Sequence, residues 1–254
     1  MTSDERWLSA VWPFVRDALP AAPARVVEIG CGPLGGFVPR LVSAGYDATG
    51  VDPEAPSGSS YRQVEFENFD LPAGLDAVVA CTSLHHVADL ADVLDLVNAA
   101  LVPGGAMVIV EWARERFDEA TARWCFDRMP ETGDLEHADH DHGDHDHADH
   151  EHGDHGHGDH DHGDHDWLWH RRAEWLESGQ PWDAFLRSWA QAEGLHAWPD
   201  ILDKLDARFD CAQTSYGPYF FADLVNTSEV DEQAAIDSGL IQANRVQYQG
   251  RRRR

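Results

Sequence analysis

A glycine-rich stretch near the start of the chain has the residue types and spacing needed to bind a nucleoside. Gly30, Gly32 and Gly35 fit the pattern G-x-G-x-x-G directly after the apolar run VVEI. Missing side chains let the backbone of such a turn approach a ligand closely. Asp52 ends the next apolar run, 22 residues after Gly30, where a carboxylate can accept hydrogen bonds from two ribose hydroxyls. Together these residues predict a nucleoside cofactor.

The charge just before the turn indicates which cofactor. Glu28 lies two residues before Gly30. A carboxylate there repels the pyrophosphate of a dinucleotide but suits a ligand that carries an amine and a sulfonium. The sequence therefore favours S-adenosylmethionine over NAD. An NAD-dependent oxidoreductase remains an alternative if Glu28 points away from the cofactor.

The elements that must position these residues alternate between strand-like and helical runs. A capping-box spacing at residues 2–5 predicts an entry helix. This βαβ order predicts an α/β fold, with a Rossmann-like, mainly parallel sheet, helices on both faces and ligand sites at the carboxyl ends of the strands. The expected strands are 25–29, 48–51, 77–81 and 106–111, and the expected helices between them are 37–44 and 90–100.

The second half of the chain is expected to add a helical lid and C-terminal antiparallel strands. A helix is predicted from Trp182 to Trp189, ending near Gly194, and a second at 231–237. Strand-like runs lie at 208–215, 219–222 and 245–248. Three regions follow: a cofactor-binding core at 1–130, a low-complexity insertion at 131–166, and the lid and final strands at 167–250. The arginine run 251–254 is expected to be a solvated, disordered terminus.

Five segments in this order resemble class I S-adenosylmethionine-dependent methyltransferases of the small-molecule branch. EIGCG (28–32) is similar to the first motif of that family, and GVD (50–52) is similar to the second. ENFDLP (67–72) resembles the segment that holds adenine. SLHHV (83–87) and LVPGG (101–105) resemble the loop after the fourth strand and the turn before the fifth.

The resemblance, which covers residues 26–111, implies methyl transfer to an O, N or C atom of a small molecule beneath a lid from the Trp-rich region 167–198. Leu34 replaces the third glycine of the commoner Gly-x-Gly-x-Gly, which we expect to shift the turn without abolishing binding. The acceptor itself is not implied, because a fold does not determine a substrate. By resemblance, the cofactor-binding residues are Glu28 and the backbone of Gly30, Cys31 and Gly32 at the methionine part, Asp52 at the ribose, and Glu67 with Asn68 at the adenine.

A general base, if the acceptor needs one, is expected after the fourth strand. His86 is the candidate catalytic residue, because a neutral imidazole at the carboxyl edge of the sheet can accept a proton. The alternative, in which His85 and His86 only shape the pocket or cap a helix, stays open. Trp112 and Tyr216 could stack on substrate or sulfonium, although core packing is the commoner role of such rings.

A repeat of Asp, His and Gly in steps of five follows, with twelve histidines between His137 and His165. The period matches neither a helix nor a strand and offers no large apolar side chain to bury, so the tract is expected to be disordered without a ligand. Imidazole and carboxylate groups are ligands that Zn, Ni or Cu accept. The candidate metal ligands are His140, His142, His145, His147, His150, His152, His155, His157, His160, His162 and His165.

Two other interpretations of this tract remain open. One is a metal-binding or metal-buffering protein whose methyltransferase-like domain binds cofactor without turnover. The other is a repeat-expanded acidic loop without a selected function.

The amino-acid composition limits the kinds of binding partner that the chain is expected to have. The net charge is −27, and thirteen of the acidic residues lie in 134–166. An acidic surface repels nucleic-acid phosphates and anionic lipid, so we expect a small-molecule substrate and neither nucleic acid nor membrane as a partner. The four cysteines form no Cys-x-x-Cys pair, no basic and apolar leader opens the chain, and no apolar run nears the length of a membrane span. A cytoplasmic location is expected, and the oligomeric state is not predicted.

Overall fold

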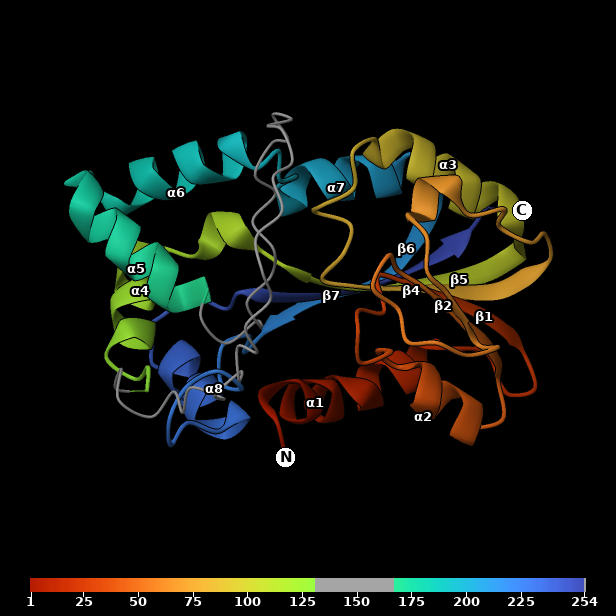
Figure 1. Ribbon diagram of the computed structural model, residues 1–254, viewed down its shortest axis with the longest axis horizontal. Coiled ribbons are helices and arrows are strands. Elements are labelled where there is room, and N and C mark those ends of the chain that lie inside the picture. The colour runs from red at the N-terminus through yellow and green to blue at the C-terminus, as the bar shows by residue number, and fades with distance from the viewer. Residues whose placement is uncertain (131–166, 254) are drawn as a thin grey trace, which may run out of the picture.

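The computed structural model describes residues 1–130 and 167–253, which fold around a seven-stranded sheet (Figure 1). The spatial order is β3-β2-β1-β4-β5-β7-β6. The first five strands are parallel, and β7 runs antiparallel to both β5 and β6. The strands are β1 (Arg25–Ile29), β2 (Asp47–Val51), β3 (Tyr61–Arg62), β4 (Leu75–Cys81), β5 (Leu101–Trp112), β6 (Phe209–Gly217) and β7 (Arg245–Arg252). The predicted fold class is confirmed.

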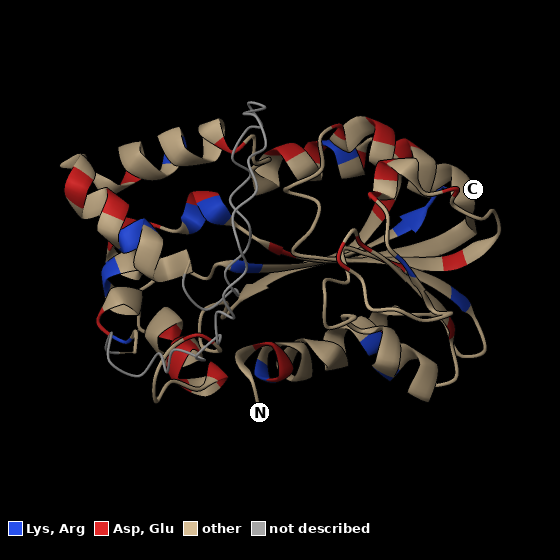
Figure 2. Cartoon of the chain, in the orientation of Figure 1, with Lys and Arg blue, Asp and Glu red and all other residues tan. Residues whose placement is uncertain are grey.

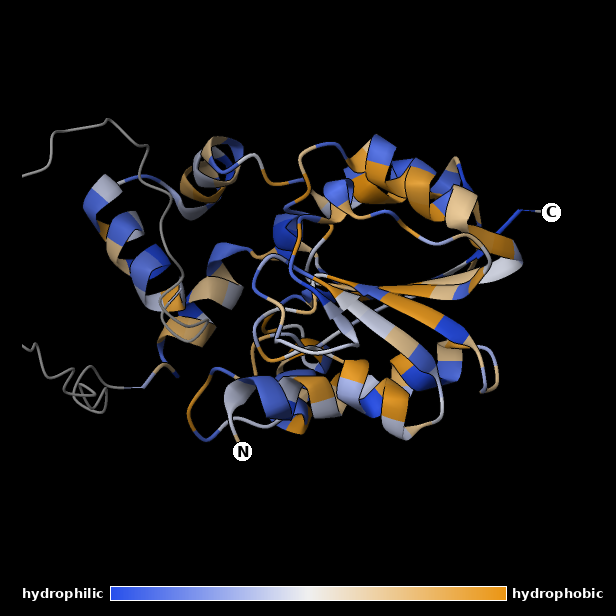
Figure 3. Cartoon of the chain, turned by 45° about the vertical axis from the view of Figure 1, so that its right-hand side comes forward, coloured by the Kyte–Doolittle hydropathy of each residue, from blue (hydrophilic) through white to orange (hydrophobic). Residues whose placement is uncertain are grey.

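Helices cover both faces of the sheet, as expected (Figure 1). On one face lie α1 (Ser3–Ala18) and α2 (Val38–Ser43), and on the other lie α3 (Leu90–Ala100) and α7 (Trp198–Asp206). Because side chains alternate across a strand, Val108 packs toward α1 whereas Ile109 packs toward α3 and α7. Both faces of β4 and β5 are therefore buried, which explains their nearly unbroken apolar sequences. These central strands are largely orange in the hydropathy view of Figure 3.

The entry helix begins as its sequence predicts. The Thr2 side chain accepts a hydrogen bond from the Glu5 amide (3.2 Å), and the Glu5 carboxylate accepts one from the Thr2 amide (3.0 Å). This reciprocal pair satisfies amide groups that would otherwise lack partners at the helix start. The helix continues through Pro13 to Ala18.

A cap of further helices lies beyond the carboxyl end of β5 (Figure 1). Its helices pack through a third apolar cluster that is rich in aromatic rings. Trp182 is fully buried at its centre, with its ring edge-on to those of Phe117 and Trp175. The cap comprises the short helix η2 (Arg114–Arg116) with α4 (Glu119–Phe126), α5 (Trp167–Ser178), α6 (Trp182–Ala192) and α8 (Glu229–Asp237).

Two local predictions are wrong. Residues 219–222 form a turn, not a strand, because the buried Glu232 carboxylate accepts hydrogen bonds from the amides of Tyr219 (2.7 Å) and Phe221 (2.6 Å). The arginine run is ordered through Arg253, because β7 extends to Arg252 along the open edge of β5. Arg253 also pairs with Asp210 at 3.1 Å.

Several strands extend past their predicted ends. β4 begins at Leu75 and β5 at Leu101, so the turn expected before β5 is part of the strand, opposite a register shift between Leu75 and Ala77. Within the two described ranges, no helix is long and apolar enough to cross a membrane. The region boundaries at 130, 166 and 250 stay predictions, and the Asp/His tract lies outside the described residues.

Candidate functional site

The glycine turn after β1 sits against the loop after β4. Gly30 has a φ of 72°, and an added Cβ would lie 2.3 Å from the Ser83 Cβ. The Ser83 hydroxyl donates to the Ile29 carbonyl (2.9 Å), which holds the two segments together. Gly32 also has a positive φ, 62°, but an added Cβ there would meet nothing within 4 Å. Gly30 is thus required by close packing, whereas Gly32 leaves its backbone open to a ligand.

Asp52 fixes the open part of this turn. Its Oδ2 accepts a hydrogen bond from the Gly32 amide (3.0 Å), and its Oδ1 accepts one from the Glu54 amide (2.8 Å). Each carboxylate oxygen has two acceptor sites, so one on each oxygen remains for a ligand hydroxyl. The predicted turn and acid therefore meet at the carboxyl ends of β1 and β2.

Glu28 lies beneath the turn and is 1% exposed. Both of its carboxylate oxygens accept the Phe37 amide hydrogen, at 3.0 and 2.8 Å, which orients the start of α2. A Cβ on Gly36 would lie 2.3 Å from Glu28 Oε1, so the chain closes tightly over this carboxyl. Burial raises the pKa of Glu28 to about 8. Glu28 therefore holds a proton at pH 7, so the charge argument from the sequence does not select the cofactor in the folded protein, and its predicted role near the methionine part is a proposal.

The side chain of Cys31 is buried within the turn. It is 5% exposed and packs against Gly50, where an added Cβ would lie 2.8 Å from the sulfur. Burial, with the nearby carboxylates of Glu28 and Asp52, raises the pKa of the Cys31 thiol to about 12. The thiol is therefore protonated at neutral pH.

A buried carboxylate at the end of β5 holds the loop after β4. Glu111 is fully buried, and its two oxygens accept the Leu84 amide hydrogen (2.7 Å) and contact His85 Nδ1 (2.7 Å). Burial favours the protonated form, but the His85 ring and the amides of Leu84 and Trp112 outweigh it, so the pKa of Glu111 lies below its usual value. This role was not predicted from the sequence, although a lone acid that ends the apolar run AMVIVE was a usable signal.

The loop held by Glu111 carries the candidate base. The His86 ring lies 4.1 Å from the His85 ring, and the residue is exposed. Desolvation and the neighbouring His85 lower the pKa of His86 to about 4, so its imidazole is neutral at pH 7. The linker between α6 and α7 closes on the same loop, since the His196 amide donates to the His85 carbonyl (3.0 Å).

The predicted adenine segment lies against this loop as well. Glu67 and Asn68 are exposed on the short helix η1 (Phe66–Asn68). Glu67 Oε1 accepts the Ala88 amide hydrogen at 3.3 Å. The structure therefore brings the turn, Asp52, the loop after β4 and η1 to one edge of the sheet.

The two aromatic candidates lie elsewhere. Trp112 is 6% exposed and stacks on Tyr219 in the cap, with ring centroids 6.1 Å apart. Tyr216 is exposed on the edge strand β6, with the Arg116 guanidinium 4.6 Å from its ring centroid. Core packing accounts for the ring of Trp112 but leaves its buried Nε1 without a partner in the described residues, and a cation–π contact accounts for Tyr216.

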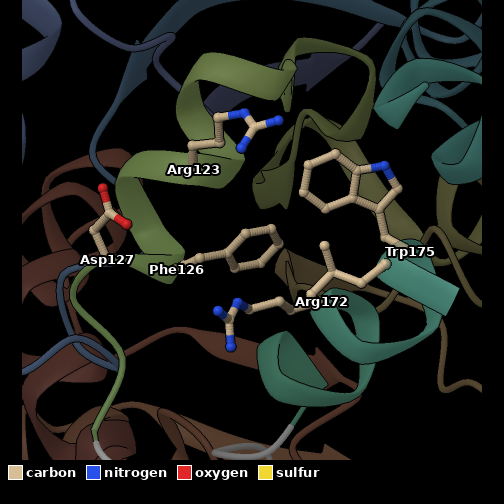
Figure 4. A pocket seen from close by; sticks show the side chains of 6 residues that line it. Arg123, Phe126, Asp127, Arg172 and Trp175 are labelled. Atoms are coloured by element: carbon tan, nitrogen blue, oxygen red, sulfur yellow. The ribbon is translucent and has the colours of Figure 1, made fainter. Parts of the chain in front are cut away.

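A surface hollow of about 180 Å³ lies between α4 and α5, away from the glycine turn (Figure 4). Figure 2 shows blue Lys and Arg segments on α4, α5 and η2. The lining of the hollow consists of Arg123, Phe126, Asp127, Arg172, Trp175 and Leu176. It contains none of the residues predicted to bind the cofactor.

No cluster of three or more His, Cys, Asp or Glu suited to a metal occurs in residues 1–130 or 167–253. The eleven predicted ligands from His140 to His165 lie outside the described residues.

Comparison with known proteins agrees with this geometry. The chain is similar to an S-adenosylmethionine-dependent methyltransferase from Mesorhizobium loti, at 18% identity and TM-score 0.54, covering 96% of this chain and all of that one. It is also similar to geranyl diphosphate C-methyltransferase from Streptomyces coelicolor A3(2), at 16% identity and TM-score 0.53, covering 98% and 80%. A third similar structure is N-methyltransferase NodS from Bradyrhizobium japonicum, at 14% identity and TM-score 0.50, and the match covers 96% of this chain and 86% of that one. No curated protein matches the chain.

At such identities these structures establish the fold, and the family comes from the sequence itself. Residues 5–198, well over half of the chain, match the family model described as a methyltransferase domain. The prediction of S-adenosylmethionine-dependent methyl transfer is thereby confirmed at the level of the family. The chain belongs to the methyltransferase domain family and is an enzyme with the class I, S-adenosylmethionine-dependent methyltransferase fold.

Proposed function

We propose that this enzyme transfers the methyl group of S-adenosylmethionine to an O, N or C atom of a small molecule bound between the sheet edge and the cap. One observation carries the proposal: the open backbone of Gly32 is held by Asp52 at the carboxyl end of β1. The strand order reverses between β1 and β4, and ligands of open α/β sheets bind at such reversals. The family match favours this activity over the NAD-dependent alternative.

The residues at this edge fit the cofactor. Asp52 retains acceptor sites for ribose hydroxyls. Glu67 and Asn68, at the position expected for adenine, are exposed. The backbone of Gly30, Cys31 and Gly32 would line the methionine part. Glu28 would act from beneath, by fixing the turn through the Phe37 amide.

When bound, S-adenosylmethionine supplies an electrophilic methyl group, which bonds to the acceptor lone pair as the C–S bond breaks and S-adenosylhomocysteine forms. The chain must align the acceptor, exclude water and, for a protonated acceptor, take up a proton. His86 is the proposed proton acceptor, since its imidazole is neutral at pH 7. Its low pKa makes it a weak base, which suits an acceptor that becomes acidic as the new bond forms. Glu111 and His85 are positioning residues for this loop.

A small acceptor is favoured by the acidic composition and by the cap over the strand ends. Two of the similar structures are named for small-molecule or N-methyl transfer, which is consistent with this class. The cytoplasmic location, the absence of nucleic-acid partners and the binding of Zn, Ni or Cu by the Asp/His tract remain predictions from composition.

Calorimetric titration of the full, chelator-treated chain with S-adenosylmethionine and S-adenosylhomocysteine tests the proposal, before and after zinc is added. We expect micromolar binding that Asp52→Ala weakens at least tenfold. Asp47→Ala is the matched control, because Asp47 is the first residue of β2, whereas Asp52 follows the last one. No binding in either metal state would overturn the proposed cofactor site.

A further inference from the structure

Arg245 is a buried cation with unused hydrogen-bond donors. It is the first residue of β7, and its side chain is 8% exposed. Nη2 pairs with Glu229 Oε1 at 2.9 Å, whereas Nε and Nη1 are buried and have no hydrogen-bond partner in the described parts of the chain. Burying such donors unpaired is costly, and most buried polar groups in proteins are paired. Stability alone does not explain this side chain.

A third unused donor lies next to it. Trp112 is paired with Arg245 across the β5–β7 ladder, and its buried Nε1 also has no partner within residues 1–130 and 167–253. Paired residues of adjacent strands project from the same face of a sheet. Val110, two residues before Trp112, packs on the α1 side, while Val246, next to Arg245, packs on the α3 side. Both side chains therefore project toward the α1 face, at the carboxyl end of β5.

The neighbouring groups define the chemistry of this place. Trp112 stacks on Tyr219, and Trp7 of α1 meets Tyr219 edge-on, with centroids 6.0 Å apart. Gly217, the other cross-strand neighbour of Arg245, leaves room for the guanidinium, since an added Cβ would lie 3.2 Å from Nη2. The charge of Arg245 also acts on Cys81, the last residue of β4, immediately before the loop that carries His86. Three donors thus meet aromatic surface beside the proposed methyl-transfer edge.

We propose that Arg245 and Trp112 bind a carboxylate of the methyl acceptor, so that the substrate is a carboxylic acid with an apolar or aromatic body. The inference rests on the proposed function and names its substrate class. Donors without acceptors select an oxygen-rich anionic group, and a guanidinium suits a planar carboxylate. A dianionic phosphate fits less well, because Glu229 already pairs with Arg245 and Glu232 lies close enough to act electrostatically on it.

Binding to the S-adenosylhomocysteine-loaded protein tests this substrate class. The probes are indole-3-acetate and 4-phenylbutyrate, their neutral amides, and phenyl phosphate, titrated by calorimetry at fixed salt. We expect each carboxylate to bind at least tenfold more tightly than its amide and more tightly than phenyl phosphate. Arg245→Met should remove the preference for the carboxylates, whereas Arg251→Met, on the same strand at its far end, should keep it.

The alternative is a purely structural ion pair between Arg245 and Glu229. In that case Arg245→Met lowers the melting temperature of the ligand-free protein by several degrees, and wild-type protein does not distinguish carboxylates from amides. We expect the ligand-free variant to melt within about two degrees of wild type or higher, because the removed guanidinium buries two nitrogens without partners in the described residues and its pair with Glu229 is replaced by solvent at the half-exposed carboxylate.

Failure of the proposed function and failure of the proposed substrate class give different results. Absence of S-adenosylhomocysteine binding contradicts the proposed function. Normal S-adenosylhomocysteine binding with no carboxylate preference, or a preference that survives in Arg245→Met, overturns only the inference about the substrate. Tighter binding of phenyl phosphate than of either carboxylate would replace the carboxylate with a phosphate.

Discussion

Two parts of the proposed site use different chemical groups. The first edge consists of the glycine turn and the loop after β4, and the second edge is the carboxyl end of β5, where Trp112 pairs with Arg245 of β7. At the first edge, backbone amides and carboxylates satisfy one another: Gly32 with Asp52, Phe37 with Glu28, and Leu84 with Glu111. At the second edge, aromatic rings surround donors that lack partners in the described structure.

The difference agrees with what we propose that each edge binds. A rigid backbone, whose own hydrogen bonds are complete before binding, can hold a cofactor that is the same in every family member. Side chains can bind an acceptor that differs between family members, and the bound substrate then supplies the missing hydrogen-bond partners. Substitutions in the backbone or the carboxylates of the first edge should therefore lower both stability and cofactor binding. Substitutions at the second edge should lower substrate binding alone.

The largest expected effect comes from Gly30→Ala. The new Cβ would lie 2.3 Å from Ser83 Cβ at a φ of 72°, so the turn and the loop after β4 must separate. We expect a loss of roughly 3 kcal/mol or more in unfolding free energy and loss of detectable cofactor binding. Gly32→Ala is the control, with the same backbone strain but no clash, and should cost about 1–2 kcal/mol. Equal losses in urea unfolding would refute the close-packing argument.

Glu111→Gln should have the next largest effect. It removes the charge that pairs with His85 and leaves one of the three donors around it facing an amide nitrogen. Leaving a buried donor without an acceptor costs about 1–3 kcal/mol, and the loosened loop should lower methyl transfer at least tenfold. The exposed Glu119→Gln on α4, which breaks only a surface pair with Arg123, should change stability by about 0.5 kcal/mol or less. Unfolding curves for the two variants make the test, and equal stability would contradict a pinning role for Glu111.

Glu28 should make stability depend on pH. Its folded pKa is about 8 and its reference value 4.5, so between these values the folded protein holds a proton that the unfolded chain releases. This contribution to stability is therefore lost progressively as the pH rises, by about 2 kcal/mol between pH 5.5 and 7. The difference in unfolding free energy between Glu28→Gln and wild type should shift in favour of the variant over that range. A difference that stays constant with pH would mean that Glu28 is ionised in the folded protein.

The same contrast explains what sequence could predict. β1, β2, β4 and α3 were predictable because apolar runs, glycine turns and acid caps are local signals, and Asp52 and Gly30 followed from their spacing. The turn at Tyr219 was mispredicted because aromatic residues favour strands, while the group that captures its amide, Glu232, is distant in sequence. Pairing with β5 similarly orders Arg251, which composition alone assigns to solvent.

The functional residues divide in the same way. The roles of Glu111 and Arg245 depend on which strands are neighbours, and no periodic pattern reports that. Unsatisfied donors become visible only once their surroundings are known, so the substrate edge could not be derived from spacing.

The smallest effect is expected from deleting residues 137–166, which tests whether either edge depends on the Asp/His tract. The flanking helices contact each other, since the rings of Phe126 on α4 and Trp175 on α5 lie 6.0 Å apart. Trp167, at the start of α5, also packs edge-on against Trp112 of β5 at 5.3 Å. A segment without large apolar side chains adds little to a core, and shortening a connection lowers its closure entropy by only about 1–2 kcal/mol. We expect the deletion to fold, to bind S-adenosylhomocysteine within about threefold of wild type in calorimetry, and to lose most zinc uptake.

An equal-length Gly/Ser replacement separates the charge of the tract from its length. If the replacement binds cofactor normally but the deletion does not fold, the connection between α4 and α5 requires length. If neither folds, the tract belongs to the core, and the division between a cofactor edge and a substrate edge would have to include it as a third structural part.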